Sequence, residues 1–352
     1  MGKQRGSRSR WKKLGIGISG FLLFVLALDL MKEGAGELVP LIRGRLDITN
    51  AADSMGFGWL MACLVLSGSP AAAAAMALLS AGALSPFQTF TMVAGSRMGA
   101  ALIVLLVGFV YVLRGHKQWS ALTVGVLSLL LTGSIYLATI PMGLLILDRG
   151  WLEGLSIPAL ENLVAGINRG LDPLVAPLVA ILPGWAIFLV GVGLVTFSFN
   201  LFDRALPQMQ LERTDFGQIP RLVYRPEVMF LMGVAITMLT MSVSISVGIL
   251  VPLSARGYIR RENIIPYIMG ANVSTLVDTL VAAALLGNPQ AVTVVMTHIV
   301  CAIVISLPLV LLAYRPYGRI VSGALAWIIR RRRNFIIFLG IILVVPVTLI
   351  LL

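Results

Sequence analysis

Long apolar stretches separated by short polar segments cover most of this chain. They occupy residues 15–31, 57–84, 87–113, 119–147, 186–202, 228–255, 262–287, 290–313 and 334–352. Several exceed the roughly 20 residues that a helix needs to cross a bilayer. None alternates in the roughly ten-residue pattern of an outer-membrane barrel. The pattern therefore predicts an all-α polytopic membrane protein.

Composition excludes a soluble domain. Hydrophobic residues make up 58% of the chain and charged residues 12%, against about a quarter charged in soluble domains. The net charge of +12 lies in loops that flank apolar runs, and no aromatic residues interleave it as in nucleic-acid-binding surfaces. We interpret the basic clusters at 3–13 and 330–333 as cytoplasmic anchors on anionic membrane lipids, and expect no nucleic-acid partner.

Two of the apolar runs align at a constant separation of 175 positions. The aligned pairs are Ser67 with Ser242, Ser69 with Ser244, Gly82 with Gly257 and Gly95 with Gly270. A second alignment, offset by 171, joins Gly20 with Gly191 and Asp29 with Asn200. An internal repeat with polar residues in the middle of each apolar copy is typical of secondary transporters whose site lies between the repeats.

The run at 57–84 is too long for one upright helix. A straight helix of this length would measure about 42 Å, against roughly 30 Å of hydrocarbon. Its centre, Ser67 to Pro70, contains a glycine and a proline that favour a break. We therefore expect a re-entrant hairpin at 57–84. We expect a second at 228–255, broken near Ser242 and Ser244 without a proline.

Loop charges favour hairpins over full crossings. With a cytoplasmic N-terminus and two hairpins, most of the 27 Lys and Arg residues lie on the cytoplasmic side. The helices at 15–31 and 186–202 then run in opposite directions, which is typical of an inverted repeat. This topology predicts cytoplasmic Arg114, Arg204, Arg256 and Arg319, and external Arg149 and Asn288.

The predicted organisation has six parts in an inner (plasma) membrane. They are a basic cytoplasmic N-terminus at 1–14, a membrane repeat at 15–147, an external linker with a short interfacial helix at 148–184, a second repeat at 185–313, a basic cytoplasmic loop at 314–333 and a transmembrane helix at 334–352.

Cys63 and Cys301 lie inside apolar runs, so we expect neither a disulfide nor a cysteine metal site.

The doubled pattern resembles the type II sodium-phosphate cotransporter family over roughly residues 17–313. The segment Gly270-Ala271-Asn272-Val273-Ser274-Thr275 matches the family's Gly-Ala-Asn motif, and Val251-Pro252-Leu253 and His298 also match. The resemblance implies two inverted repeats and a phosphate and sodium site at Ser67, Ser69, Ser242 and Ser244. Sodium would lie near Ser67, Ser242, Asn272 and Thr275, with Ser274 close by.

The chain also departs from the family's pattern. Leu66-Ser67-Gly68-Ser69 and Met241-Ser242-Val243-Ser244 replace the family's two Gln-Ser-Ser-Ser motifs, so both glutamines are missing. Gly95-Ser96-Arg97 replaces the first Gly-Ala-Asn triplet, and Asp278 stands where a hydroxyl residue is expected. Arg97 and Asp278 are either a structural ion pair or functional groups, Arg97 for an oxyanion and Asp278 for a cation or proton.

The leading hypothesis is an ion-coupled secondary transporter of inorganic phosphate or a similar small oxyanion, with sodium as coupling ion and no other cofactor. A proton-coupled or uncoupled carrier is the first alternative, and a non-transporting scaffold or sensor the second. An enzyme acting on lipid phosphates ranks lowest, because no nucleophile and base pair appears. The serines could instead serve helix packing, and His298 fits packing better than proton relay.

Overall fold

The structure, a computed structural model, describes residues 2–45, 48–113, 120–154, 158–205, 225–255, 259 and 261–351, and these segments contain no strand. Arg114 and Arg256 lie outside them. The helices are α1 (Gly2–Pro40), the π-helical turn η1 (Leu41–Arg45), α2 (Ala51–Val65), α3 (Gly68–Ser80), α4 (Pro86–Leu113), α5 (Ser120–Asp148), α6 (Pro158–Ile181), α7 (Gly184–Ala205), α8 (Pro226–Thr240), α9 (Val243–Gly248), α10 (Leu250–Ala255), α11 (Arg261–Ser274), α12 (Leu276–Leu285), α13 (Pro289–Leu311), α14 (Tyr314–Arg330) and α15 (Arg332–Ile350).

Seven of the described helical stretches are long and apolar enough to cross a membrane, which confirms the expected all-α membrane-like fold. They are Lys12–Gly44, Pro86–Leu113, Leu122–Asp148, Gly184–Ala205, Glu262–Leu285, Pro289–Leu311 and Arg332–Ile350. The two segments expected to form hairpins consist of short helices. The longest of these helices, α2 and α8, have 15 residues each. At 1.5 Å per residue they measure about 22 Å, too short to cross.

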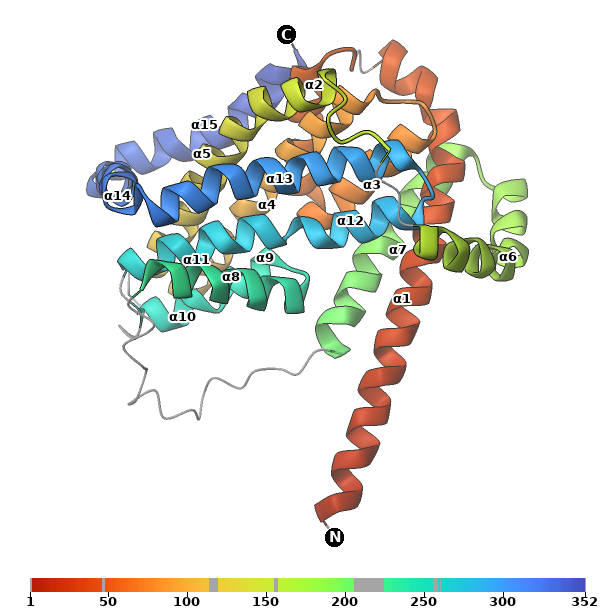
Figure 1. The fold of residues 1–352 in the computed structure, drawn as a ribbon, viewed down its shortest axis with the longest axis horizontal. Helices are drawn as coiled ribbons and strands as arrows, with labels where there is room; N and C mark the ends of the chain where they lie inside the picture. The colour runs from red at the N-terminus through yellow and green to blue at the C-terminus, as the bar shows by residue number, and fades with distance from the viewer. Residues whose placement is uncertain are drawn as a thin grey trace.

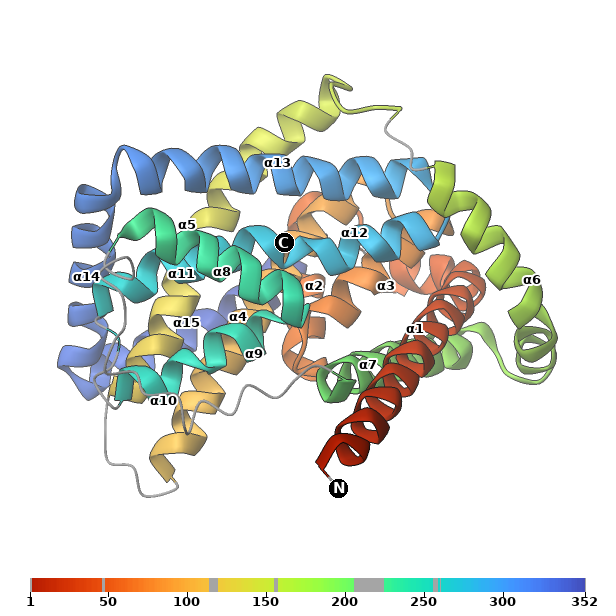
Figure 2. The same ribbon diagram turned by 60° about the horizontal axis from the view of Figure 1, so that its bottom comes forward.

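α11 and α12 follow one another in line through the middle of the molecule, α13 runs alongside both, and α8 runs alongside α11 (Figure 1). The pair α1 and α7 packs at one end, and α14 lies at the other end, where it joins α13 to α15 and runs across α13 (Figures 1 and 2). The buried Val321, Leu325 and Ile328 form one stripe of α14. The segment 314–333, expected to be a loop, is thus helical, because its apolar spacing of four and three residues suits a helix packed on one side.

α1 and α7 form an antiparallel pair with reciprocal contacts. A Cβ built on Gly20 would lie 3.3 Å from the Phe202 ring, and one built on Gly191 would lie 2.4 Å from the Met31 side chain. Gly191 lies 171 positions after Gly20, and Phe202 lies 171 positions after Met31. The glycine of each helix therefore contacts the residue that is equivalent in the other helix.

The packing of α2 on α4 recurs in the packing of α8 on α11. A Cβ on Gly95 would lie 2.0 Å from the carbonyl oxygen of Met55, and a Cβ on Gly270 would lie 2.0 Å from that of Phe230. Both residues of the second pair are 175 positions beyond those of the first. Only glycine permits such an approach of two helix backbones.

Four side-chain hydrogen bonds connect the segments predicted to be external, and these segments lie at one edge of the molecule. The bonds join Arg43 Nη2 to Gly82 O (2.9 Å), Gln88 Nε2 to Ile48 O (3.2 Å), Asn288 Nδ2 to Ser80 Oγ (3.2 Å) and Thr293 Oγ1 to Leu152 O (3.3 Å). Ile48 precedes α2 and Gly82 follows α3, so the chain enters and leaves this helix pair at the same edge. The Tyr314 hydroxyl donates to the Glu262 carbonyl, which joins two segments predicted to be cytoplasmic.

Candidate functional site

Two helix breaks at equivalent positions form the centre of the candidate site. Leu66 (φ 53°) and Met241 (φ 49°) are the non-glycine residues with positive φ in the described segments. Each ends a helix, and Ser67 or Ser242 follows in extended conformation. A left-handed residue other than glycine costs about 1–2 kcal/mol, so the surrounding packing must hold both breaks in place.

Both breaks line one cavity of about 280 Å³. Its lining residues are Val65, Leu66, Ser67, Ser69, Thr196, Phe199, Asn200, Asp203, Met241, Ser242, Ser244 and Ile245. The structure therefore brings together the four serines selected from the sequence. Ser242 caps α9 by accepting a hydrogen bond from the amide of Ile245 (3.3 Å), whereas Ser67, at the same position of α3, makes no capping bond.

The first break is packed tightly onto α4. A Cβ built on Gly68 would lie 2.8 Å from the Ala100 Cβ and 3.0 Å from the Ser96 carbonyl oxygen, with Arg97 Nη1 at 3.7 Å. Pro70 lies in the first turn of α3, where its missing amide hydrogen costs no helical bond. The break thus rests directly beside the Arg97 guanidinium.

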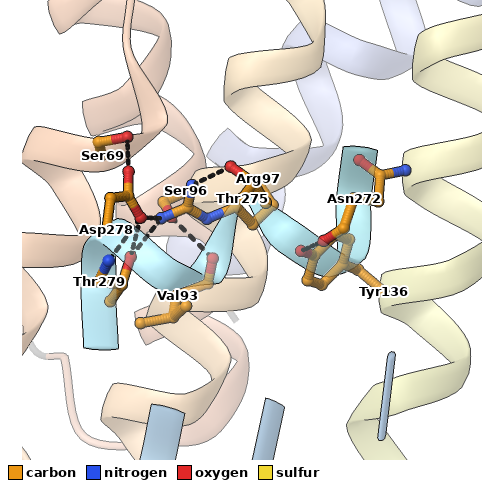
Figure 3. A network of polar contacts seen from close by, with 9 residues as sticks. All are labelled: Ser69, Val93, Ser96, Arg97, Tyr136, Asn272, Thr275, Asp278 and Thr279. Atoms are coloured by element: carbon orange, nitrogen blue, oxygen red, sulfur yellow. Dashed lines mark hydrogen bonds and ion pairs between the residues drawn. The ribbon is translucent and has the colours of Figure 1, made fainter. Parts of the chain in front are cut away.

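Arg97 and Asp278 form a buried ion pair behind the first break. Arg97 Nη2 lies 3.9 Å from Asp278 Oδ1, and the two residues are 4% and 3% exposed. The Ser69 hydroxyl donates a hydrogen bond to the other carboxylate oxygen of Asp278, and the Thr279 hydroxyl donates to Oδ1 (2.8 Å). Figure 3 shows Ser69, Arg97 and Asp278 pointing toward one another from three helices.

The guanidinium of Arg97 is held by two further hydroxyls. Nη1 donates to Thr275 (3.0 Å) and Nη2 to Thr279 (2.8 Å). Its Nε is buried and has no hydrogen-bond partner among the described residues. The guanidinium is therefore fixed in orientation, while its Nε–H group has no partner in the described segments.

Asn272 lies to one side of this network (Figure 3). Its Oδ1 accepts from the Thr132 hydroxyl (3.1 Å), its backbone carbonyl accepts from Tyr136 (2.9 Å), and its Nδ2 is buried without a partner in the described chain. Ser274 bonds to carbonyls of its own helix turn, those of Gly270 and Ala271. Ser274 thus has the contacts of a helix-packing serine.

The four predicted sodium ligands do not all line one space. Ser67 and Ser242 line the cavity, whereas Asn272 and Thr275 are each 2% exposed and are not among its lining residues. The Thr275 hydroxyl also accepts from the permanently charged Arg97. A sodium ion at Thr275 would therefore be repelled by a fixed cation.

His298 packs inside the protein. Its ring stacks on Phe90 with centroids 3.7 Å apart, and its Nε2 lies 2.7 Å from the Phe90 carbonyl oxygen. Because a carbonyl oxygen only accepts, Nε2 is the donor in this contact, which fits the packing role expected from the sequence.

One wall of the cavity was not foreseen from the sequence. Thr196, Phe199, Asn200 and Asp203 all belong to α7. The alignment of Asn200 with Asp29 already singled out this helix. The other three residues lie three, four and seven positions from Thr196, a spacing that places all four on one face of a helix and could have predicted this wall.

The described residues contain no group of three or more His, Cys, Asp or Glu side chains that could hold a metal ion. The available chemistry is therefore that of hydroxyls, helix-end amides, one buried ion pair and one carboxylate at a cavity. No protein-family model, curated protein or solved structure matches this chain.

Proposed function

We propose that this protein is an ion-coupled secondary transporter of inorganic phosphate or a similar small oxyanion. The observation that carries the proposal is the cavity between two helix breaks, at positions 66 and 241, lined by Ser67, Ser69, Ser242 and Ser244. Transporter sites commonly lie where two interrupted helices of related repeats meet.

An inverted repeat with two re-entrant hairpins is the architecture that we propose for this carrier. Three contacts support it: the reciprocal pairing of α1 with α7, the repeated glycine contacts at Gly95 and Gly270, and the common edge at which α2 begins and α3 ends. A two-fold relation between the halves accounts for the first two, and a hairpin accounts for the third.

The cavity offers groups that suit a partly dehydrated oxyanion. The hydroxyls of Ser67, Ser242 and Ser244 can donate hydrogen bonds, whereas that of Ser69 already donates to Asp278. The first amides of α3 are free of helical partners at the break. Arg97 lies close behind Gly68, outside the cavity lining and paired with Asp278, so hydroxyls and free amides rather than a net positive charge are the groups that suit an anion.

Either sodium or a proton is the coupling ion in this proposal. The family resemblance implies sodium, whereas the separation of Thr275 from the cavity and its bond to Arg97 favour a proton. We further propose an inner-membrane location with a cytoplasmic N-terminus, because the basic loops would then lie inside.

Phosphate uptake into proteoliposomes tests the function. Radiolabelled phosphate should accumulate under an imposed sodium or proton gradient, above protein-free vesicles, and Ser306→Ala provides a control at a buried serine outside the cavity. Absence of uptake of phosphate and of sulfate under both gradients would overturn the proposal and leave the scaffold or sensor hypothesis.

A further inference from the structure

The α7 wall of the cavity carries a carboxyl group. Asp203 on α7 is partly buried and is the one ionisable side chain among the residues that line the cavity. Thr196, Phe199 and Asn200 share its face of the helix. A carboxyl group therefore shares the cavity with the four serines that we propose receive the oxyanion.

No described cation pairs with Asp203. Arg204 is exposed on the same helix, and Lys13 of α1 lines a separate depression beside Ala205. Asp278, which lies behind Ser69, is already paired with Arg97. The other described charged side chains on the helices around α7 and the cavity are Lys12, Asp29, Lys32, Glu33 and Glu37 on α1, Asp172 on α6, Asp53 on α2 and Glu227 on α8. None of them forms an ion pair or hydrogen bond with Asp203 in the described segments.

An ionised Asp203 would oppose anion binding. Like charges in one partly enclosed space repel, and protonation of the carboxyl group removes that repulsion. Because linkage is reciprocal, an anion in the cavity raises the proton affinity of Asp203 and the bound proton raises the affinity for the anion.

The surroundings of Asp203 suit a proton better than a metal cation. Hard cations need several oxygen ligands at once, yet Asp203 is the one carboxylate that lines the cavity, and the described residues contain no group of three or more His, Cys, Asp or Glu side chains that could hold a metal ion. A proton needs no such shell.

We propose that Asp203 carries the proton that accompanies the oxyanion through the cavity, which makes the protein a proton-coupled anion carrier. This inference rests on the proposed transport function and adds the coupling ion and the residue that binds it.

Steady-state phosphate accumulation in proteoliposomes tests the inference. External pH is held constant and internal pH is varied, and accumulation is expressed as the inside-to-outside ratio of one ionic form of phosphate, because total internal phosphate changes with its own ionisation. For one coupled proton, a gradient of about one pH unit multiplies accumulation by at most about tenfold. We expect such a response from the wild type and Asp203→Glu, and none from Asp203→Asn. A full response in Asp203→Asn would overturn the inference while leaving transport intact, whereas no uptake by the wild type would overturn the proposed function itself.

Carbodiimide labelling provides a readout that needs no transport. Dicyclohexylcarbodiimide reacts with protonated carboxyl groups in apolar surroundings, and peptide mass spectrometry locates the adduct. Labelling of Asp203 should increase as pH falls through the neutral range, and the exposed Asp148 serves as the control that stays unlabelled. Labelling of Asp203 that does not change with pH would overturn the assignment of a proton to this residue.

Discussion

The hydroxyl of Ser69 donates a hydrogen bond to Asp278, 209 residues away along the chain. Ser69 lies at the first helix break and lines the cavity, whereas Asp278 belongs to α12 and pairs with Arg97 at 3.9 Å. The bond therefore connects the cavity wall to the buried ion pair. Any movement of the break must alter the surroundings of that pair.

Ser69→Ala and Ser244→Ala test whether the bond to Asp278 matters in addition to a serine's place in the cavity wall. Loss of a hydrogen bond to a charged group costs about 1.5–3 kcal/mol, so Ser69→Ala should lower both the melting temperature and phosphate uptake. Ser244→Ala should lower uptake with little change in melting temperature. Membrane abundance, detergent melting curves and uptake provide the measurements, with Ser306→Ala as control. Unchanged uptake in both variants would leave the serines as packing residues.

Arg97 and Asp278 should depend on one another for folding. Breaking a buried pair by removing one partner costs about 3–5 kcal/mol, because the other charge is left unpaired. We expect Arg97→Ala and Asp278→Ala each to lower the melting temperature strongly, and the double variant to recover most of that loss. The double variant should remain inactive in uptake, because Ser69 at the cavity wall loses the carboxylate that holds it and the guanidinium behind the break is gone.

Two other outcomes have clear meanings for this pair. Recovery of both folding and transport in the double variant would identify a purely structural ion pair. Simple additivity of the two single changes in both assays would show that the residues do not interact energetically.

Gly95→Ala and Gly270→Ala test whether the two halves pack alike. An added Cβ would lie 2.0 Å from a helix carbonyl oxygen in both cases, and overpacking of this kind costs about 1–3 kcal/mol or more. Equal and large drops in melting temperature are expected. Gly193→Ala is the control, since nothing lies within 4 Å of its added Cβ. A large drop in one variant and none in the other would contradict equivalent packing.

The sequence allowed the helical fold and the position of both breaks to be predicted, because these depend on local features. Apolar run lengths exceed a crossing length, and the paired serines repeat at a constant offset. The break itself falls one residue earlier than the Ser67 to Pro70 segment, at Leu66, because Pro70 is accommodated in the first turn of α3.

Apart from the Arg97–Asp278 pair and the meeting of the four serines, tertiary contacts were not accessible from local patterns. Asp203 gave no motif, and only the packing of α7 beside the breaks brings it to the cavity. The bonds from Arg97 to Thr275 and Thr279 likewise depend on how α4 meets α11 and α12. The basic charges of segment 314–333 indicated a cytoplasmic loop, whereas the apolar spacing of the same segment indicated a helix packed on one side. The charges alone were used, so α14 was not predicted.

Single cysteines at Arg149 and Arg319 test the proposed orientation. Both side chains are exposed. Leu152, near the first, accepts a hydrogen bond from Thr293 at the start of α13, whereas the second follows the end of that helix. A helix of 23 residues measures about 35 Å, enough to cross the hydrocarbon layer. After Cys63 and Cys301 are replaced by alanine, an impermeant maleimide should label Arg149→Cys in intact cells and Arg319→Cys only in inverted vesicles, because arginine-rich segments stay cytoplasmic. Labelling of both positions from one side would exclude a crossing by α13, and with it the proposed arrangement of the second repeat.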